Sequence, residues 1–358
     1  MQPDEIILAH AEKYPLMQPR DVVKLCYQAC FGAGHLLTDQ NAALEWLQSE
    51  YSETEPDDGE LFEPLPGGYT RLYLGAAKRQ GIPSELVFAL FRATAGMPPQ
   101  NDAPALFRAL LECVLTLAER GSFAFARDQL EFYLYSYLTD ARVPPPASHS
   151  DIYRSAYSPH YRVVDARFVP LVELCKAINA LMHDAQNQKR TVIAFDGRCA
   201  SGKTTAADLI SRAFDAQIIH CDDFFLPPEL RTPGRFAEPG GNIHYERFEE
   251  EVLAKLSIGE PFEYGVFDCS QGRITQTARV GSSKLVIVEG AYSMHPRFGQ
   301  YYALSAFFDI SPERQKARII ARDGEEAWQA FENRWIPLEE TYISSSNADK
   351  RADIVIRT

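Results

Sequence analysis

The chain has 358 residues, a length that suits two domains. With 46% hydrophobic and 24% charged residues it has the composition of a folded globular protein, so disorder as its main state is excluded. The formal net charge of −13 argues against a general nucleic-acid binder, which needs a broad basic face. No stretch approaches the ~18 apolar residues of a membrane helix, and the N-terminus lacks a secretory pattern. We therefore expect a cytoplasmic protein with neither a membrane nor a nucleic-acid partner.

Apolar residues recur at helical spacing in three N-terminal segments, 4–13, 20–31 and 38–50. The second segment carries one apolar stripe, formed by Val22, Val23, Cys26, Tyr27 and Cys30. Cys26 and Cys30 are interpreted as buried apolar side chains, because two further ligands at zinc-finger spacing are missing. The seven cysteines contain no CxxC pair, which favours reduced and mostly structural thiols.

The remainder of the first half is also mainly helical. An acidic loop at 52–68 is interpreted as solvated, and Tyr69–Leu74 is a short strand candidate. Helical spacing returns over Pro83–Leu138, and regular structure is interrupted near Ala95–Pro104, at Gly121 and at Pro144–Pro146. These patterns predict a mostly helical domain of unknown role over residues 1–165.

This helical half offers weak candidates for a site. The segment Phe31-Gly-Ala-Gly34-His35 lies between two predicted helices, and its glycines favour a helix C-terminus. Asp39 follows four residues after His35. A second site built from His35, His149 and His160 is one hypothesis. The alternative is a capping or hydrogen-bonding role, which is more common for a histidine in a loop.

The second half changes to alternating strand and helix patterns. Residues 149–170 are rich in aromatics and poor in glycine, which predicts an ordered connector. A helix at about 168–186 follows, so that 166–189 connects the first domain to a second one at 190–358. Strand candidates are Thr191–Phe195, Gln217–His220, Leu285–Val288, Ala306–Ile310 and Asp353–Ile356. Their alternation with helices predicts an α/β domain with a mainly parallel sheet flanked by helices.

The strongest motif joins the first of these strands to the next helix. Gly197-Arg-Cys-Ala-Ser-Gly202-Lys203-Thr204 fits G-x-x-x-x-G-K-[ST] at every defined position. In such a loop, backbone N–H groups cradle phosphate oxygens, the lysine reaches the β- and γ-phosphates, and the threonine hydroxyl binds Mg²⁺. We expect ATP and Mg²⁺ as cofactors, with nucleotide contacts from Gly197, Arg198, Cys199, Ala200, Ser201, Gly202, Lys203, Thr204 and Thr205.

Two carboxylates follow apolar strands beside this loop. Asp222 stands after Gln217–His220, and Glu289 ends the strand candidate that begins at Leu285. At the carboxyl ends of parallel strands, such acids can accept a hydroxyl proton or hold Mg²⁺. We expect a metal site formed by Thr204, Asp222 and Glu289. The alternative for Asp222 is a helix cap or a solvated turn.

Several segments together resemble the uridine kinase and phosphoribulokinase group of P-loop kinases. They span about residues 190–358 in the family's order: DGRCASGKTT, CDDFF, GGNIHYERFEEEVLAKLSIGEPFEYGVFDC, LVIVEGAY, ARIIARDG and ADIVI. The resemblance implies a P-loop NTPase fold and phosphoryl transfer to an alcohol group. It places Asp222 at the catalytic base and Glu289 at the metal-linked acid. It also implies that Lys203, Arg318 and Arg322 act on the transferring phosphoryl group.

The acceptor side departs from the family pattern. The Tyr-Asp, His and Arg motif is replaced by Phe267-Asp268-Cys-Ser-Gln271-Gly-Arg273, without a histidine. Phe225 replaces the tyrosine of the DSFY-like motif, and only Arg334 could substitute for a third lid arginine. The candidate acceptor residues are Asp223, Phe225, Phe267, Asp268 and Arg273. Because a pocket with different hydrogen bonds rejects the usual ligand, phosphoryl transfer is better supported than uridine as acceptor.

Three functional hypotheses follow. In the first, the protein is an ATP-dependent kinase acting on a hydroxyl of a nucleoside-, sugar- or polyol-like molecule. In the second, the P-loop half is a nucleotide-hydrolysing switch, and the helical half contacts a partner. In the third, the helical half is itself an enzyme. A small-molecule acceptor is the expected partner, and self-association into a homo-oligomer stays open.

Overall fold

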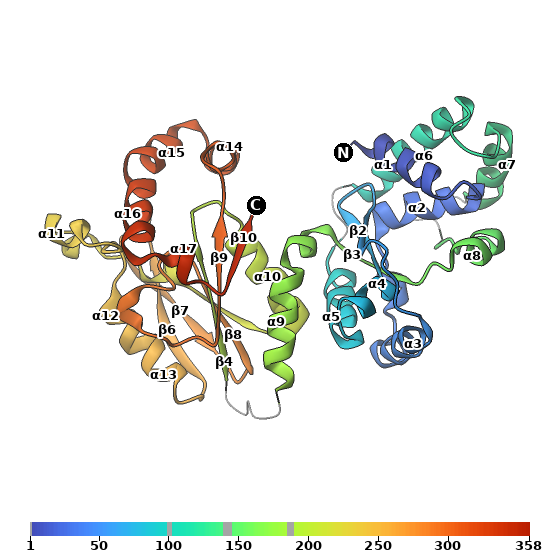
Figure 1. Cartoon of the computed structure of the whole chain (residues 1–358). Helices are drawn as coiled ribbons and strands as arrows, with labels where there is room; N and C mark the ends of the chain where they lie inside the picture. The colour runs from blue at the N-terminus through green and yellow to red at the C-terminus, as the bar shows by residue number, and fades with distance from the viewer. Residues whose placement is uncertain (1, 99–101, 139–144, 185–189) are drawn as a thin grey trace. The chain divides into compact units, whose positions relative to one another are not determined.

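The computed structural model describes residues 2–98, 102–138, 145–184 and 190–358 (Figure 1). The chain divides into two compact units, Met1–Val169 and Pro170–Thr358. This division falls inside the segment 166–189 that the sequence predicts to connect two domains.

The first unit is mostly helical, as predicted. Its helices are α1 (Pro3–Lys13), α2 (Pro19–Phe31), α3 (Gln40–Glu53), α4 (Leu74–Arg79), α5 (Ser84–Ala95), α6 (Ala103–Glu119), α7 (Arg127–Tyr137) and α8 (Asp151–Tyr157), with a 3₁₀ turn at Gly34–Leu36. The predicted stripe of α2 is buried, including Cys26 and Cys30. Gly32 ends this helix with φ +60°, a conformation that glycine adopts without strain. All seven cysteines are free.

A small antiparallel sheet completes the first unit. Its strands are β1 (Phe62–Pro64), β2 (Tyr69–Tyr73) and β3 (Tyr161–Asp165), in the order β1-β2-β3. The segment 149–170 is therefore more than a connector, because it holds α8 and β3 and so belongs to the fold of this unit. All five residues of β3 are buried, and a strand buried on both faces lacks the alternation that identifies strands in sequence.

The second unit is built on a five-stranded sheet in which all neighbouring strands are parallel. The strand order is β10-β9-β4-β8-β5. The strands are β4 (Thr191–Gly197), β5 (Gln217–His220), β8 (Leu285–Glu289), β9 (Leu304–Asp309) and β10 (Ile354–Arg357). They agree with the five strand candidates, so the predicted α/β fold with a parallel sheet is confirmed.

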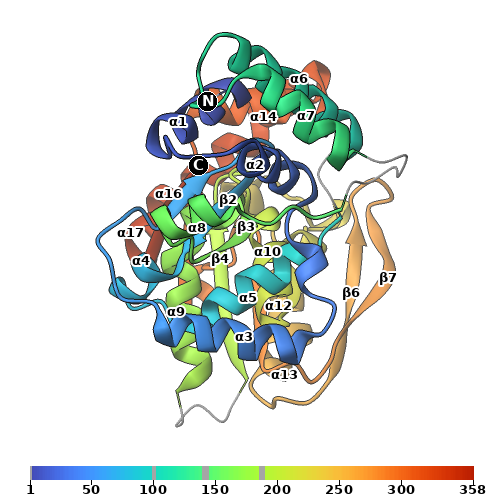
Figure 2. The ribbon, with the colours of Figure 1, turned by 90° about the vertical axis from the view of Figure 1, so that its right-hand side faces the viewer.

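Helices cover both faces of this sheet. In Figures 1 and 2, α9 (Val172–His183) and α10 (Lys203–Phe214) lie on one face, and α16 (Ile336–Ser346) and α17 (Ala348–Arg351) lie on the other. The helix predicted at 168–186 begins later, because a 3₁₀ turn at Ala166–Leu171 contains Pro170. Its predicted residues 185 and 186 lie outside the described residues, as does Pro144.

A two-stranded antiparallel hairpin, β6 (Phe262–Asp268) and β7 (Arg273–Val280), lies apart from the parallel sheet. Its second strand is almost entirely exposed, so no buried face marked it in the sequence. The remaining helical segments of this unit are η3 (Cys221–Phe224), η4 (Pro228–Leu230), α11 (Pro233–Ala237), α12 (Tyr245–Phe248), η5 (Glu249–Leu253), α13 (Ala254–Leu256), η6 (Pro296–Phe298), α14 (Pro312–Asp323), α15 (Glu325–Ala330) and η7 (Phe331–Trp335). Both η5 and η7 are π-helical turns.

The core of the second unit lies between the sheet and its helices. Val286 and Val288 of β8 and Phe307 of β9 are fully buried in one hydrophobic cluster there. No helix in the described part of the chain is long and apolar enough to cross a membrane.

Candidate functional site

Two glycines, Gly197 and Gly202, permit the tight shape of the loop between β4 and α10. Gly197 has φ +130°, and a Cβ atom there would lie 2.1 Å from the carbonyl oxygen of Phe308. Gly202 caps α10 with φ +95°, and Ala200 also has a positive φ of 58°. A larger residue at Gly197 would therefore collide with the backbone of β9. The loop thus wraps tightly at the start of α10, where backbone N–H groups are unpaired and favour an anion.

Lys203 places its ammonium group inside this loop. Its Nζ donates to the carbonyl oxygens of Gly197 at 2.8 Å and of Arg198 at 2.9 Å. The residue is buried although it begins a helix. The loop therefore concentrates positive charge from one lysine and the end of α10, on a chain whose net charge is negative.

Thr204 and Glu289 meet beside the loop. The Thr204 hydroxyl donates to Glu289, with Oγ1 3.2 Å from Oε1. Nδ1 of His220, the last residue of β5, donates to the same oxygen at 2.6 Å. This hydrogen bond and the Glu289 charge raise the pKa of His220. The residue types that hold Mg²⁺ in this kind of site, a hydroxyl and a carboxylate, are thus brought together.

Asp222 lies in η3, directly after β5. Its side chain is exposed to solvent, yet many protein atoms surround it. This crowding and the negative charge of Glu289 raise its pKa, while Lys203 opposes the shift. The nearby Asp223 accepts a hydrogen bond from the hydroxyl of Tyr264 at 3.1 Å. Asp222 and Asp223 thus lie at the carboxyl end of β5, and the carboxylate of Glu289 lies at the carboxyl end of β8.

The outer side of the loop is held by other contacts. Arg198 donates to Glu340 at 2.7 Å and to Asp309 at 2.6 Å. Arg318 donates to the carbonyl oxygen of Ala200 at 3.0 Å and to the hydroxyl of Thr358. The predicted site residue Arg318 therefore contacts the loop, by a hydrogen bond to a backbone oxygen. Thr205 is exposed on α10, and Ser201 is buried within the loop.

Arg322 and Arg334 make contacts of their own. Arg322 pairs with the neighbouring Asp323 at 2.7 Å. Arg334 stacks over Phe236 and Trp335, with its guanidinium carbon 5.1 and 4.7 Å from the ring centroids. In the described part of the chain neither arginine forms a hydrogen bond with the loop, but Arg322 lies near enough to Cys199 and Asp222 to interact with them electrostatically, and these interactions help to raise its pKa.

The predicted acceptor residues fall into two places. Phe225 pairs with Ile243 through an isolated β-bridge, and its ring centroid lies 6.5 Å from that of Trp335. Asp268 caps the turn of the β6–β7 hairpin by accepting from the backbone N–H of Ser270 at 2.8 Å. Arg273 donates to Gln271 in this turn, and Phe267 is buried nearby in β6. Asp223 and Phe225 therefore stand beside Asp222 in sequence and space, whereas Asp268 and Arg273 serve the hairpin turn.

Sequence reasoning missed four residues of this region. His220 could have been found, because it is the last residue of the strand that leads to Asp222 and so lies at the carboxyl end of that strand. Glu339 accepts a hydrogen bond from the backbone N–H of Cys199 at 2.9 Å, across a separation of 140 residues. Tyr264 contacts Asp223, and Arg247 donates to the carbonyl oxygen of Asp223 at 3.0 Å. No local pattern marks these last three.

Magnesium fits the oxygen groups near the loop. Within residues 2–98, 102–138, 145–184 and 190–358, no group of three or more His, Cys, Asp or Glu side chains is arranged to hold a metal by itself. Mg²⁺ commonly uses one or two carboxylates with substrate phosphates and waters, so Thr204 and Glu289 suit it.

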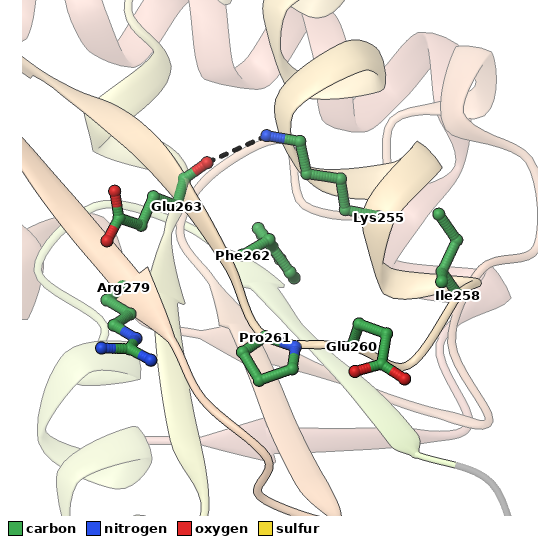
Figure 3. Close-up of a pocket in the computed structure, with 7 residues that line it drawn as sticks. All are labelled: Lys255, Ile258, Glu260, Pro261, Phe262, Glu263 and Arg279. Carbon is green, nitrogen blue, oxygen red and sulfur yellow. Dashed lines mark hydrogen bonds between the residues drawn. The ribbon is translucent and has the colours of Figure 1, made fainter.

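A pocket of about 610 Å³ lies elsewhere in the second unit, at the base of the β6–β7 hairpin (Figure 3). Lys255 donates to the carbonyl oxygen of Glu263 above it, and Phe262 lies below. The other lining residues are Ile258, Glu260, Pro261 and Arg279. None of the predicted site residues lines this pocket.

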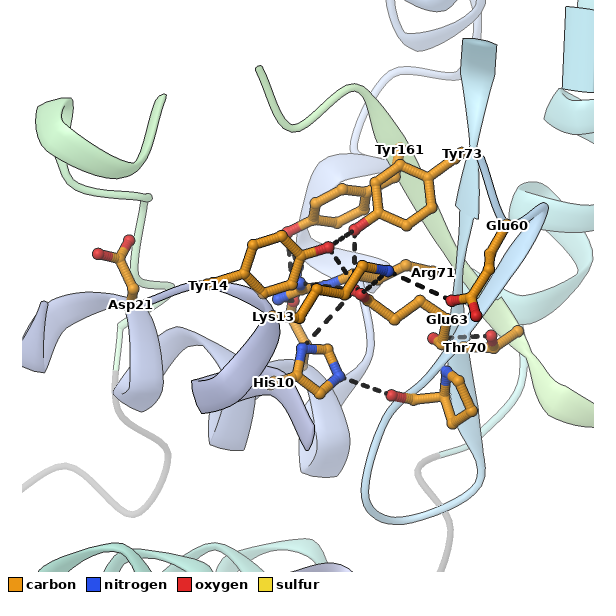
Figure 4. A network of polar contacts seen from close by, with 12 residues as sticks. His10, Lys13, Tyr14, Asp21, Glu60, Glu63, Thr70, Arg71, Tyr73 and Tyr161 are labelled. Atoms are coloured by element: carbon orange, nitrogen blue, oxygen red, sulfur yellow. Dashed lines mark hydrogen bonds and ion pairs between the residues drawn. The ribbon is translucent and has the colours of Figure 1, made fainter. Parts of the chain in front are cut away.

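The first unit holds a buried polar network (Figure 4). Arg71 is fully buried and donates to Glu63 at 3.0 Å and to Gln28 at 3.2 Å. Glu63 also accepts from Lys13 at 2.7 Å and from Tyr14 at 2.6 Å. This network joins α1, α2 and the small sheet.

The three histidines considered for a second site have separate partners. His149 contacts Asp21 at 3.0 Å and Tyr161 at 2.6 Å. His160 contacts Glu50, and His35 packs its ring edge against another aromatic ring. The structure does not bring the three together, and each has the hydrogen-bonding or packing role of the alternative interpretation.

Comparisons with known proteins cover parts of the chain. No family model matches it. A curated relative, a tRNA dimethylallyltransferase of Chlorobium phaeobacteroides, is 30% identical over 138 residues, which span 38% of this chain and 40% of the relative. A solved structure named a possible uridine kinase from Bacillus stearothermophilus is 20% identical, covers 52% of this chain and 97% of its own, and has a TM-score of 0.41. TT1252 from Thermus thermophilus is 16% identical, covers 48% of this chain and 90% of its own, and has a TM-score of 0.30.

The sheet order and the loop define the fold of the second unit independently of these likenesses. The central strand β4 of a parallel sheet leads through a glycine-rich loop into α10. On one side of β4, Glu289 ends the neighbouring strand β8, and Asp222 follows the next strand, β5. The second unit therefore has the P-loop fold, a parallel α/β sheet whose strand β4 leads through the motif Gly197–Thr204 into α10.

Proposed function

We propose that this protein is an ATP-dependent kinase that transfers the γ-phosphoryl group to a hydroxyl of a nucleoside-, sugar- or polyol-like molecule. One observation carries the proposal. The P-loop residue Thr204, the strand-end acid Glu289 and the acid Asp222 gather at one edge of a parallel sheet. A protein that only bound nucleotide would not need the acid Asp222 beside the loop.

Each residue has a role in this reaction. The acceptor oxygen attacks the γ-phosphorus, the bond from that phosphorus to the β–γ bridging oxygen breaks, and ADP leaves. Asp222 takes the proton of the acceptor hydroxyl. Lys203 leaves its loop carbonyls and neutralises the phosphates, and the loop amides hold their oxygens. Thr204 and Glu289 would hold Mg²⁺, which neutralises charge on the phosphates when bound.

A panel of candidate acceptor molecules tests the proposal. ADP release from ATP is measured for the full chain with nucleosides, sugars, polyols and vitamin precursors, at a fixed Mg²⁺ concentration. We expect one class of acceptor to stimulate ADP release, and Asp222→Asn to abolish that stimulation while ATP binding remains. Asp215→Asn, a change at the C-cap of α10, is the matched control and should retain stimulation. Basal hydrolysis unchanged by every acceptor would contradict the proposal.

A nucleotide switch is the second candidate, and the contacts between α16 and the loop favour it. Arg198 and Cys199 of the loop both contact α16, so a bound nucleotide could change the position of this helix. In that case ATP and ADP would give different protection of α16 from hydrogen exchange, without any acceptor effect on turnover.

The curated relative is named for dimethylallyl transfer to tRNA, so this reaction is included as a further test. Dimethylallyl diphosphate with bulk tRNA should give no product if this protein is a small-molecule kinase. The net charge of −13 also argues against a polyanionic acceptor.

A further inference from the structure

Glu339 is a buried carboxylate that contacts the nucleotide loop from outside the P-loop motif. Its Oε2 accepts a hydrogen bond from the backbone N–H of Cys199 at 2.9 Å. The side chain is buried, with the residue 7% exposed. Cys199 lies between Gly197 and Gly202, on the loop whose N–H groups are proposed to hold phosphate. A carboxylate oxygen thus already holds one donor of this loop.

The charge of Glu339 is compensated by the nearby charge of Lys203 and by hydrogen bonds from the backbone and side chain of Cys199. Among the residues that the structure describes, no cation forms an ion pair with it. Lys203 is near enough for its charge to favour the ionised carboxylate, yet its Nζ donates to loop carbonyl oxygens instead. The adjacent Glu340, in contrast, pairs with Arg198 through both of its oxygens. Burial raises the pKa of Glu339, and the negative charge of Asp222 adds to the shift.

Helix α16 holds Glu339 firmly in place. The hydroxyl of Tyr342 donates to Asp196 at 2.6 Å, and Asp196 is the residue of β4 directly before Gly197. With the Glu340–Arg198 pair and the Glu339–Cys199 bond, the helix contacts this strand and loop through three residues. These contacts hold the part of α16 that carries Glu339 against the loop.

We propose that Glu339 is a positioning residue that sets the nucleotide affinity of the loop in two opposing ways. Its accepted hydrogen bond fixes the Cys199 amide and so orders the loop. Its negative charge repels the phosphates of a bound nucleotide. The inference rests on the proposed function only in so far as the loop binds a nucleotide.

Two substitutions separate these effects. Glu339→Gln keeps an oxygen that can accept from Cys199 and removes the charge, whereas Glu339→Ala removes both. Dissociation constants for ATP, ADP and AMP are measured by calorimetry on the full chain, with Mg²⁺ present. We expect Glu339→Gln to bind ATP about tenfold more tightly than the wild type, because the substitution removes the repulsion between the buried carboxylate and the phosphates. The gain should fall from ATP to ADP to AMP. Glu339→Ala should bind ATP several-fold more weakly than Glu339→Gln.

Glu332→Gln is the matched control. Glu332 is exposed on the π-helical turn before α16, so the same substitution removes the same net charge from a screened position. Its ATP affinity should stay within about twofold of the wild type. Thermal melting of each variant shows whether the fold is kept.

Three outcomes would overturn the inference. The first is equal ATP affinity in wild type and Glu339→Gln, and the second is equal affinity in the two Glu339 variants. In both cases ATP binding and acceptor-stimulated turnover by the wild type would leave the proposed function intact. The third is a folded wild type that binds no nucleotide, which would overturn the proposed function as well.

Discussion

Thr204 and Glu289 face each other across the gap between α10 and β8, with Oγ1 of the threonine 3.2 Å from Oε1 of the glutamate. The two residues are separated by 85 positions in the sequence, and the parallel pairing of β4 with β8 brings them together. A hydroxyl and a carboxylate in this arrangement are hard oxygen ligands, the kind that Mg²⁺ prefers.

Replacement of Glu289 should therefore weaken Mg²⁺ binding more than it weakens nucleotide binding. We expect Glu289→Gln to raise the Mg²⁺ concentration needed for half-maximal turnover by at least tenfold, because even outer partners of metal ligands contribute about 10–100-fold to affinity. Turnover is measured against Mg²⁺ concentration at saturating ATP. Glu313→Gln, an exposed change in the first turn of α14, is the control. An unchanged Mg²⁺ requirement in Glu289→Gln would contradict a metal role for this residue.

Lys203 supplies the side-chain positive charge inside the loop. Its Nζ lies 2.8 Å from the carbonyl oxygen of Gly197, so the loop holds it close to the site of the phosphates. We expect Lys203→Ala to lower phosphoryl transfer by several orders of magnitude, since positioning and charge stabilisation carry this chemistry. Single-turnover transfer with the best acceptor of the panel is the measurement. Near-wild-type turnover would contradict the assignment of the loop.

Contiguous motifs made much of the second unit predictable. Residues 197–204 carry the loop signature without interruption, and each of the five apolar strands of the parallel sheet was recognisable. The fold class follows from these alone. The roles of Asp222 and Glu289 stay predictions until the variants are measured.

Residues that act through long-range contacts escaped prediction. Glu339 meets Cys199 across 140 positions, and no spacing rule links them. Strand β3 was not predicted because both of its faces are buried. Strand β7 was not predicted because almost all of its residues are exposed. In each case the missing information is tertiary burial, which a single sequence does not display.

The Glu63–Arg71 pair should be important for the stability of the first unit. Arg71 is fully buried, and its Nη1 lies 3.0 Å from Oε2 of Glu63. We expect Glu63→Gln to lower the free energy of unfolding of this unit by about 3–5 kcal/mol, because a buried guanidinium is left without its counter-charge. Hydrogen exchange of peptides from β2 and β3 reports this loss. Glu60→Gln removes an exposed partner of Lys13 and should cost at most about 1 kcal/mol. Equal effects of the two variants would contradict the argument.

The same network should make the first unit sensitive to acid. Burial lowers the pKa of His10 and of His149 from 6.5 to about 4. Burial of Glu63 would raise its pKa, but the charge of Arg71 and further contacts lower it to about 2. In both windows, pH 6.5 to 4 for the histidines and 4.5 to 2 for the glutamate, the unfolded chain binds more protons than the folded one.

Stability should therefore be highest above pH 6.5 and fall continuously as the pH drops through both windows. Each histidine is expected to contribute on the order of 3 kcal/mol of this loss. Hydrogen exchange of β2 and β3 peptides, corrected for the intrinsic pH dependence of exchange, measures it. In His149→Gln the loss between pH 6.5 and 4 should be smaller, because one titrating group is removed while a hydrogen-bonding side chain remains. His160→Gln, a change at a half-exposed ring, should keep the wild-type profile. A wild-type profile that is flat from pH 6.5 to 4 would show that these histidines are not held neutral by burial.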